Sequence, residues 1–215
     1  MLAPPRWRAK HIFFHTMKLV LATNNEDKIT EIRACLADLE LEIMTRADFE
    51  NFPDPPETAN TLEGNAELKA RAISDSTSLP ALADDTGLEV AALNGAPGVF
   101  SARYSGEDAT YESNCAKLLR EMEGLPEDKR GARFRTVIAI VWDRDLKLVD
   151  GVVDGRITES PRGASGFGYD PVFLYPPAGK TFAEMTLEEK NEISHRGKAL
   201  AQARGVLEKL LKSSF

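Results

Sequence analysis

The chain has 215 residues, a length that favours one domain with a substantial core. Its formal net charge of −7 argues against a protein that coats nucleic acid, because such binding requires an extended basic face. No run approaches the ~18 consecutive apolar residues of a membrane span, so we expect neither nucleic acid nor membrane as a partner. Cys35 and Cys115 lack the paired spacing of zinc or redox sites, which favours a reducing cytoplasm.

Residues 1–16, MLAPPRWRAKHIFFHT, are basic and contain two prolines, and a strand pattern begins directly after them at Met17. We therefore expect 1–16 to be an extension outside the fold and 17–215 to form a single domain. His11 and His15 have the spacing that can hold a metal on a helix face, but no third ligand is near them in the sequence. Terminal segments are usually loose, so we assign this pair no site.

Strand and helix patterns alternate at the start of the folded part. Residues 18–22 are a short run of β type, and apolar side chains then recur every three or four positions, as on one helix face. These side chains are Ile29, Ile32, Leu36 and Leu39. Residues 51–60 are a proline-rich loop, and the spacing of Asn60 and Glu63 predicts a capped helix that ends at about Ser74.

The middle of the chain contains strand patterns around one helix. Residues 81–84 predict a strand that stops at Asp85-Thr86-Gly87, and the alternation over 88–92 predicts another strand. Residues 111–122 predict a helix. The run FRTVIAIVW at 134–142 is apolar and rich in β-branched residues, as is typical of a central strand.

The second half completes the fold pattern. Residues 146–153 look like the hairpin partner of the central strand, residues 172–175 predict a further strand, and apolar positions over 199–210 define a C-terminal amphipathic helix. Hairpins and strand–helix units both occur. The expected fold class is therefore α/β, with helices flanking a central mixed β-sheet.

A polar segment separates the first strand from the first helix. It comprises Thr23, Asn24, Asn25, Glu26, Asp27 and Lys28. The free backbone amides and positive dipole end of a helix N-terminus form an anion site, and Lys28 adds a full charge, which suits phosphate. The alternative is that the threonine and asparagines only cap the helix while Lys28 is solvated.

Two further polar groups could serve the same ligand. Asn65 and Lys69 are one turn apart on the predicted helix and so share a face, although a solvated polar face also explains them. Asp84 and Asp85 follow a strand and precede a hydroxyl residue and a glycine, and such carboxylates can hold Mg²⁺ and orient a water. An aspartate turn without metal is the alternative reading.

The segment SGFGYDP at 165–171 suits a flat polar ligand such as a nucleobase. Its glycines allow close backbone approach, and Phe167 and Tyr169 offer a stacking face. Near the last helix, Ser194 is a plausible cap and is followed by His195 and Arg196. Cations in a first turn oppose the helix dipole, and this local cost suggests a ligand there.

Six blocks occur in one order along the chain. They are Thr-x-Asn-x-x-Lys at 23–28, Asn65-Ala66 with Lys69-Ala70, ADDTGLEV at 83–90, GAPGVFSARYSG at 95–106, GFGYDPVF at 166–173 and ISHR at 193–196. Together they resemble the Ham1-type family of inosine/xanthosine triphosphate pyrophosphatases, over roughly residues 17–211.

The resemblance implies a homodimeric, two-lobed α/β fold whose active site lies in the cleft between the lobes. It also implies Mg²⁺-dependent hydrolysis of ITP, dITP and XTP to the monophosphate and pyrophosphate, which removes deaminated nucleotides from the precursor pool. Residues 17–215 would then be one catalytic domain acting on a small-molecule nucleotide in the cytoplasm.

The resemblance also assigns roles by position. Residues 23–28 would hold the triphosphate, Asp85 would be the general base and a metal ligand, and Glu57 would be a second metal ligand. Thr86 would touch the substrate and Lys190 would lie close to it. The residues that would embrace the base are Phe167, Gly168, Tyr169, Asp170, His195 and Arg196.

Three positions depart from the family pattern. Thr86 stands where serine is usual, which keeps the hydroxyl, and Asn24 stands where glycine is common. Gly64 replaces a common glutamate and costs roughly 0.5–1 kcal/mol in a helix interior relative to alanine. Glu63 receives no role.

Two alternatives remain open from the sequence. One is a house-cleaning pyrophosphatase of the Maf type, which acts on other modified or pyrimidine nucleotides. The other is a catalytically silent nucleotide sensor or RNA-binding module, against which the acidic pair and the lack of a basic stripe speak.

Overall fold

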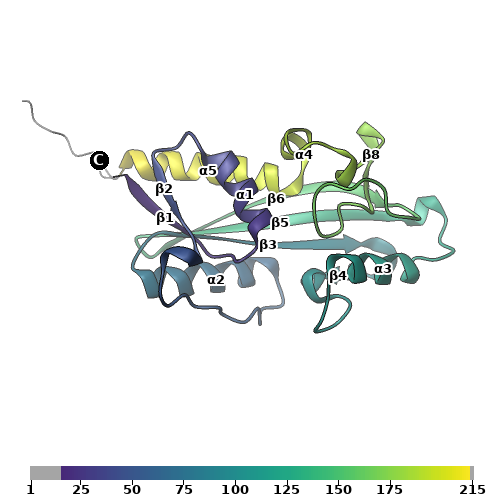
Figure 1. Cartoon of the computed structure of the whole chain (residues 1–215), viewed down its shortest axis with the longest axis horizontal. Coiled ribbons are helices and arrows are strands. Elements are labelled where there is room, and N and C mark those ends of the chain that lie inside the picture. Colours follow the sequence, from purple (N-terminus) through teal and green to yellow (C-terminus); the bar gives the residue numbers. More distant parts are fainter. Residues whose placement is uncertain (1–15, 214–215) are drawn as a thin grey trace, which may run out of the picture.

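The computed structural model describes residues 16–213, in which helices pack on both faces of a sheet (Figure 1). The expected extension at 1–16 lies outside the described residues except for its last position, and so do His11 and His15. None of the helices between 16 and 213 combines the length and apolar character that crossing a membrane requires.

The sheet is mixed and has the strand order β2-β1-β3-β5-β6-β7-β8, with β4 paired to β3. Strand β1 is parallel to β2 and β3, and all other pairs are antiparallel. The strands are β1 (Met17–Leu21), β2 (Leu41–Met44), β3 (Ala81–Val90), β4 (Pro97–Gly98), β5 (Gly131–Trp142), β6 (Asp145–Ile157), β7 (Phe173–Tyr175) and β8 (Lys180–Thr181). The predicted α/β class with a mixed sheet is confirmed.

Alternating strand residues divide the core between the two faces of the sheet. The helices are α1 (Glu26–Leu36), α2 (Leu62–Thr77), α3 (Tyr111–Glu121), α4 (Leu187–Ile193) and α5 (His195–Ser213). On one face Leu82 and Ile138 pack with α1 and α5, and on the other Ala83 and Val137 pack with α2. The two-residue period of a strand produces this division.

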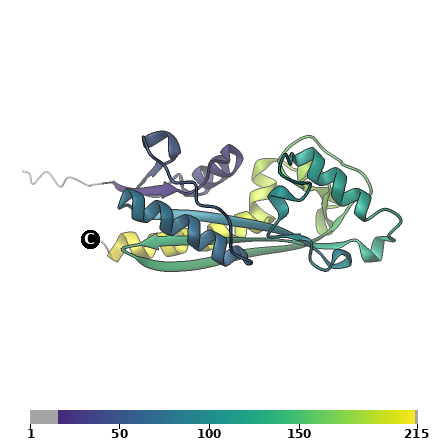
Figure 2. The same ribbon diagram turned by 90° about the horizontal axis from the view of Figure 1, so that it is seen from below.

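A third core cluster occupies the far end of the long strands. It joins α3 to the ends of β3 and β5 and to the segment around β7, and Phe134 and Phe173 are its central rings. Figures 1 and 2 show β3, β5 and β6 running from the β1 and α1 end to the α3 and β8 end. The long strands therefore connect two lobes, as expected.

The predicted break of the strand at Asp85-Thr86-Gly87 is wrong. Strand β3 continues to Val90, and these three residues pair with Val137, Thr136 and Arg135 of β5. Tertiary partners keep the polar stretch in the strand, since the Thr86 and Thr136 hydroxyls lie 2.7 Å apart. A Cβ at position 87 would lie 2.9 Å from the Gly98 carbonyl oxygen, so glycine permits the close approach of β4.

The helix boundaries also differ in detail from the expectation. The N-cap of α2 is Thr61 rather than Asn60, because the Thr61 hydroxyl accepts a hydrogen bond from the Gly64 amide, and α2 ends at Thr77. Leu39 lies beyond the end of α1. The short elements β2 and α4 have no counterpart in the prediction, and β6 extends past the expected 146–153 at both ends.

Candidate active site

A cleft lies between the two lobes and is lined by side chains from both. Its lining includes Asn25, Lys28, Glu57, Asp85, Thr86, Tyr111, Phe167, Gly168, Tyr169, Asp170, His195 and Arg196. A neighbouring hollow shares Lys28 and Glu57 with it and adds Thr23 and Asn24. Another hollow shares Phe167 and adds Asp27 and Lys190. Of the residues to which the resemblance assigned a role only Glu26 lines none of the three, and its side chain is exposed at the start of α1.

The segment before α1 is built as a cap. Asn25 is the N-cap, its Oδ1 accepts from the Lys28 amide at 3.1 Å, and the Thr23 hydroxyl accepts from the Asn25 amide at 3.2 Å. The capping half of the alternative reading is thus confirmed. The other half, a solvated Lys28, is wrong. The Lys28 Nζ lies 3.0 Å from Asp84 Oδ2, and the Lys28 side chain is only 17% exposed. Burial above all lowers the pKa of Lys28.

Asp84 is the buried anion at the centre of the site. Its Oδ2 also lies 3.3 Å from a guanidinium nitrogen of Arg196, while its Oδ1 has no hydrogen-bond partner among the described residues. Burial alone would favour the neutral acid, but the charges of Lys28, Arg196 and Lys69 hold the pKa of Asp84 well below its usual range. Asp84 is therefore a permanent carboxylate.

Asp85 has a different environment although it is the next residue. Its Oδ1 lies 3.1 Å from Lys69 Nζ and its Oδ2 accepts from Asn65 Nδ2 at 3.2 Å. Asn65 and Lys69 of α2 thus share a face that points into the site, as their spacing suggested. Burial and the Glu57 carboxylate raise the pKa of Asp85 above its usual value, against the opposing charge of Lys69. Two adjacent carboxylates with opposite pKa shifts are typical of a division of roles.

Glu57 reaches the cleft from the proline-rich loop. Lys69 Nζ lies 2.9 Å from its Oε1, and Arg103 donates to its Oε2 at 2.9 Å. The ammonium of Lys69 therefore bridges the carboxylates of Glu57 and Asp85. Burial opposes ionisation of Glu57, but Lys69 and Arg103 lower its pKa overall.

Phe167 forms the opposite wall of the cleft. Its ring lies 5.9 Å from that of Tyr111, and the cations of Lys190 and Arg196 lie 4.7 Å and 5.2 Å from its centre. Tyr169 does not share this position. It is 4% exposed, belongs to the core cluster, and its hydroxyl donates to the Ser101 carbonyl. Both rings line the cleft, but Phe167 is the more accessible of the two and Tyr169 reaches the cleft from the core.

A buried ion network supports the Phe167 wall. Lys190 of α4 lies 2.7 Å from Asp170 Oδ2 and 3.0 Å from Glu31 Oε1, and Arg196 lies 2.7 Å from Glu31 Oε2. Asp170 Oδ2 also accepts from the Phe167 amide at 2.9 Å. Glu31 thus offsets the cost of a cation in the first turn of α5, which the sequence alone left unbalanced.

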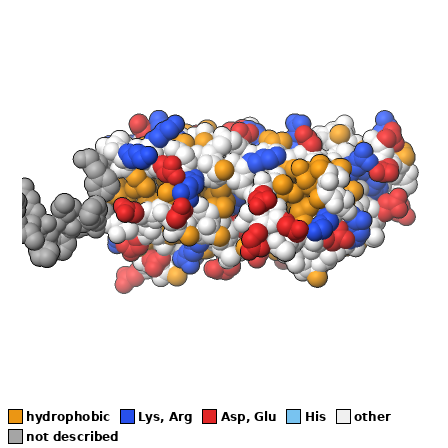
Figure 3. All heavy atoms as spheres, turned by 90° about the horizontal axis from the view of Figure 1, so that it is seen from above, with side chains coloured by type: hydrophobic (Ala, Val, Ile, Leu, Met, Phe, Trp, Pro, Cys, Tyr) orange, Lys and Arg blue, Asp and Glu red, His pale blue; other side chains and the backbone are white. Residues whose placement is uncertain are grey.

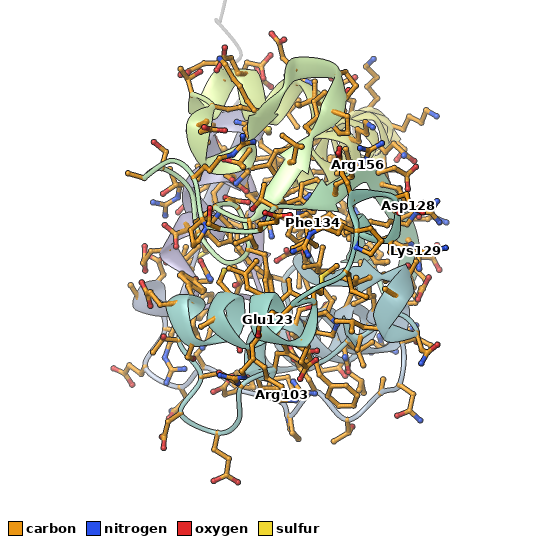
Figure 4. All side chains as sticks on the ribbon, turned by 90° about the vertical axis from the view of Figure 1, so that its right-hand side faces the viewer. Arg103, Glu123, Asp128, Lys129, Phe134 and Arg156 are labelled. Carbon is orange, nitrogen blue, oxygen red and sulfur yellow. The ribbon has the colours of Figure 1, made fainter. Side chains whose placement is uncertain are left out.

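His195 is held at the inner end of the cleft. Ser194 caps its helix, accepting from the Gly197 amide at 3.0 Å, and the imidazole stacks on Phe134 at 4.4 Å. Figure 4 views the lobe that contains α3 and β8. It places Phe134 in the interior of that lobe, whereas Arg156, Asp128 and Lys129 lie at its rim. Burial, with Arg196 and Lys190 nearby, lowers the pKa of His195 well below its usual value. Its Nδ1 has no partner among the described residues.

The residues of the site that the sequence did not predict include Glu31, Arg103 and Tyr111. Glu31 lies one turn after Lys28 among apolar positions of α1, and an acidic residue on an apolar helix face was a signal that it is paired. Arg103 falls inside the block at 95–106 but was given no role. Tyr111 lies outside every block and had no signal beyond its place at the start of a helix.

Comparison with known proteins places the chain among nucleotide pyrophosphatases. Residues 19–206 match the model of the Ham1 family. A dITP/XTP pyrophosphatase from Thermoanaerobacter sp. is 47% identical over 196 residues, covering 91% of this chain and 99% of the relative. Another from Geobacillus kaustophilus is 49% identical over 186 residues, covering 86% and 91%. The structure of a HAM1 protein from Coxiella burnetii matches with a TM-score of 0.83 at 44% identity, over 90% of this chain and 99% of that chain.

Proposed function

Because this chain belongs to the Ham1 family, we propose that it hydrolyses ITP, dITP and XTP to the monophosphate and pyrophosphate. It thereby removes deaminated purine nucleotides from the precursor pool. One observation carries this conclusion beyond the family: a single cleft brings the Lys28 and Asp85 groups, which suit a triphosphate, to the same cavity as Phe167, which suits a base. A nucleoside triphosphate likewise carries its triphosphate at one end and its base at the other.

The triphosphate is bound by the segment from Thr23 to Lys28. The start of α1 directs backbone amides and the positive end of the helix dipole at an anion, and Lys28 adds charge at the cleft. The Lys28 ammonium is already paired with Asp84, so it is held in place rather than free in solvent. A positioned cation of this kind stabilises the charge that develops on phosphate oxygens during hydrolysis.

A divalent metal belongs to this chemistry, and we assign it as Mg²⁺ held by Asp85 and Glu57. The donor set fits: both are carboxylates, and both already share one cation, the Lys69 ammonium. Mg²⁺ usually takes one or two protein carboxylates and completes its shell with water and substrate phosphate oxygens. When bound, it supplies charge that polarises the phosphoryl group.

Asp85 acts as the general base that takes a proton from the attacking water. A base works best when its pKa lies near the working pH, and burial beside Glu57 moves the Asp85 pKa in that direction. Asn65 and Lys69 fix both oxygens of the carboxylate. The neighbouring Thr86 hydroxyl is held between Thr136 and Arg196 and faces the substrate.

The purine ring is recognised at the other end of the cleft. Phe167 stacks on the ring, with Gly168, Tyr169 and Asp170 shaping the loop around it and Lys190 close by. Donors from His195 and Arg196 suit the 6-oxo group of hypoxanthine or xanthine. The adenine amino group would leave those buried donors unpaired, and discrimination of this kind can reach ~10⁴ or more.

The cellular location, oligomeric state and partners that we propose rest on the sequence features and on the family resemblance. We place the enzyme in the cytoplasm as a homodimer whose one catalytic domain spans 17–215, with no nucleic-acid or membrane partner. Both cysteines are free thiols, as in a reducing compartment. On the face drawn in Figure 3, basic side chains are interspersed with acidic ones and make no continuous stripe. The homodimer rests on the family resemblance, and sedimentation of the purified chain tests it.

The deciding experiment is a pyrophosphate-release panel. Purified protein is given ITP, dITP, XTP, ATP, GTP, dUTP and UTP, each with Mg²⁺ and with excess chelator. We expect release from ITP, dITP and XTP alone, and only with Mg²⁺. Preference for dUTP or UTP would support the Maf-type alternative, and no release from any nucleotide would overturn the enzymatic assignment.

A further inference from the structure

Tyr111 is the one aromatic side chain that touches both walls of the cleft among the described residues. It is the first residue of α3, the residue is 41% exposed, and it lines the same cavity as Asp85 and Arg196. In Figure 2, α1 and α3 lie on the same side of the long strands, in different lobes. A large exposed aromatic residue at this place is available to a ligand without any change in the core.

The hydroxyl of Tyr111 contacts the phosphate-binding wall. It accepts a hydrogen bond from Asn25 Nδ2 at 2.9 Å, and Asn25 is the N-cap of α1. Burial and the nearby Asp27 carboxylate raise the pKa of Tyr111, so the hydroxyl stays protonated at neutral pH and keeps a proton to donate. The bond to Asn25 thus fixes the outer end of the side chain at the start of α1.

The ring of Tyr111 contacts the base-binding wall. Its centroid lies 5.9 Å from that of Phe167 with the planes tilted by 42°, an arrangement typical of favourable aromatic pairs. Asn25 and Phe167 are 142 residues apart by their numbers and belong to different lobes. One side chain therefore connects the two lobes across the open side of the cleft.

We propose that Tyr111 is a substrate-positioning residue that contacts the sugar of the bound nucleotide and closes the cleft over it. The inference rests on the proposed function, which puts the phosphates at residues 23–28 and the base on Phe167. The sugar is the covalent link between phosphates and base, so it lies against the residue that touches both walls. A contact that substrate and transition state make equally lowers KM without raising kcat, and that is the role proposed for Tyr111.

Two variants separate the contribution of the Tyr111 hydroxyl from that of its ring. Tyr111→Phe removes only the hydroxyl bond to Asn25, and Tyr111→Ala removes the ring as well. A hydrogen bond between the Tyr111 hydroxyl and the sugar would contribute ~0.5–1.5 kcal/mol, so we expect Tyr111→Phe to weaken ITP binding by ~2- to 12-fold. We expect a larger loss for Tyr111→Ala. Tyr104→Phe is the matched control, since Tyr104 also uses its hydroxyl on a partner, Glu121, but does not line the cleft.

The test measures binding apart from turnover. The variants are made in an Asp85→Asn background, and titration calorimetry with Mg²⁺ gives the Kd of ITP and of inorganic tripolyphosphate, which has no sugar or base. We expect ITP to bind more weakly in both Tyr111 variants while tripolyphosphate binding stays within about twofold. In the active protein the same changes should raise KM for ITP and leave kcat nearly unchanged.

Two results would overturn the inference. One is ITP binding by Tyr111→Ala that equals the Tyr104→Phe control. The other is an equal loss for ITP and tripolyphosphate, which would mean that Tyr111 only shapes the phosphate segment through Asn25. Failure of the proposed function is seen separately, as absence of pyrophosphate release by the unmodified chain.

Discussion

Lys69 and Asp85 form an ion pair in the cleft, with 3.1 Å between Lys69 Nζ and Asp85 Oδ1. The same ammonium contacts Glu57 Oε1 and the Asp84 carbonyl oxygen, so it holds three acceptors from two segments. Burial disfavours the charged lysine, but Asp85, Asp84 and Glu57 together raise its pKa. Lys69 is therefore a fixed positive charge beside the proposed base.

The first prediction is that Lys69→Met moves the acidic limb of the pH–rate profile upward. Asp85 works when deprotonated, so activity rises as pH passes through its pKa. Lys69 lowers that pKa, and its loss leaves burial and Glu57 to raise it further. We therefore expect the acidic limb of kcat/KM to move to higher pH. Lys18→Met, at an exposed pair, should leave the limb in place, and an unmoved limb in Lys69→Met would separate Lys69 from the base.

Glu57→Gln should raise the Mg²⁺ requirement. The amide keeps the shape of the side chain but removes the charge of one proposed metal ligand. We expect the Mg²⁺ concentration for half-maximal rate to rise at least ~10-fold, since loss of even an outer-shell partner commonly costs that much. The rate as a function of Mg²⁺ measures it. Glu50→Gln, at an exposed position near the same loop, is the control, and identical curves for the two variants would remove Glu57 from the metal site.

Glu31→Gln should strongly destabilise the fold. It leaves Lys190 and Arg196, both buried, short of a carboxylate partner. Breaking a buried pair in this way costs about 3–5 kcal/mol. Urea unfolding at neutral pH measures the free energy, with Glu42→Gln as control, because its exposed pair with Lys18 contributes about 0–1 kcal/mol. Equal costs for the two variants would contradict the account of the network.

His195 should make stability depend on pH just below neutrality. Its pKa is lowered in the folded protein, so below about pH 6.5 the unfolded chain binds a proton that the folded chain does not. The stabilising contribution is present above the unfolded pKa and is lost as pH falls, by up to ~1.4 kcal/mol per pH unit. Urea unfolding of the natural chain and of His195→Asn between pH 7 and 5.5 should therefore converge. Parallel curves would mean that His195 titrates normally.

Much of the fold could be predicted because the spacing of apolar residues along the sequence reflects which side chains are buried in the core. The β5 run and the C-terminal helix have their patterns imposed by side chains that pack on the sheet. The continuity of β3 could not be read in this way. Its polar residues stay in the sheet through Thr136, Lys69 and Asn65, partners that are distant in sequence.

The candidate site likewise has parts that a local sequence pattern predicts and parts that depend on long-range contacts. The segment before α1, the acidic pair and the glycine loop are local, so their residue types alone indicated phosphate, metal and base. The network of Glu31 with Lys190 and Arg196 joins positions 159 and 165 residues apart, and no local pattern records such pairs. The burial of the Tyr169 ring likewise depends on packing against side chains that are distant in the sequence.

The most direct test of the account is turnover and binding of ITP by Asp85→Asn. The asparagine is nearly isosteric, keeps Asn65 and Lys69 as neighbours, and cannot accept a proton from water. We predict that pyrophosphate release falls by roughly 10²–10⁴-fold while the Kd of ITP at saturating Mg²⁺ changes only a few-fold. Release of pyrophosphate at the unmodified rate would contradict the assignment of Asp85 as the base.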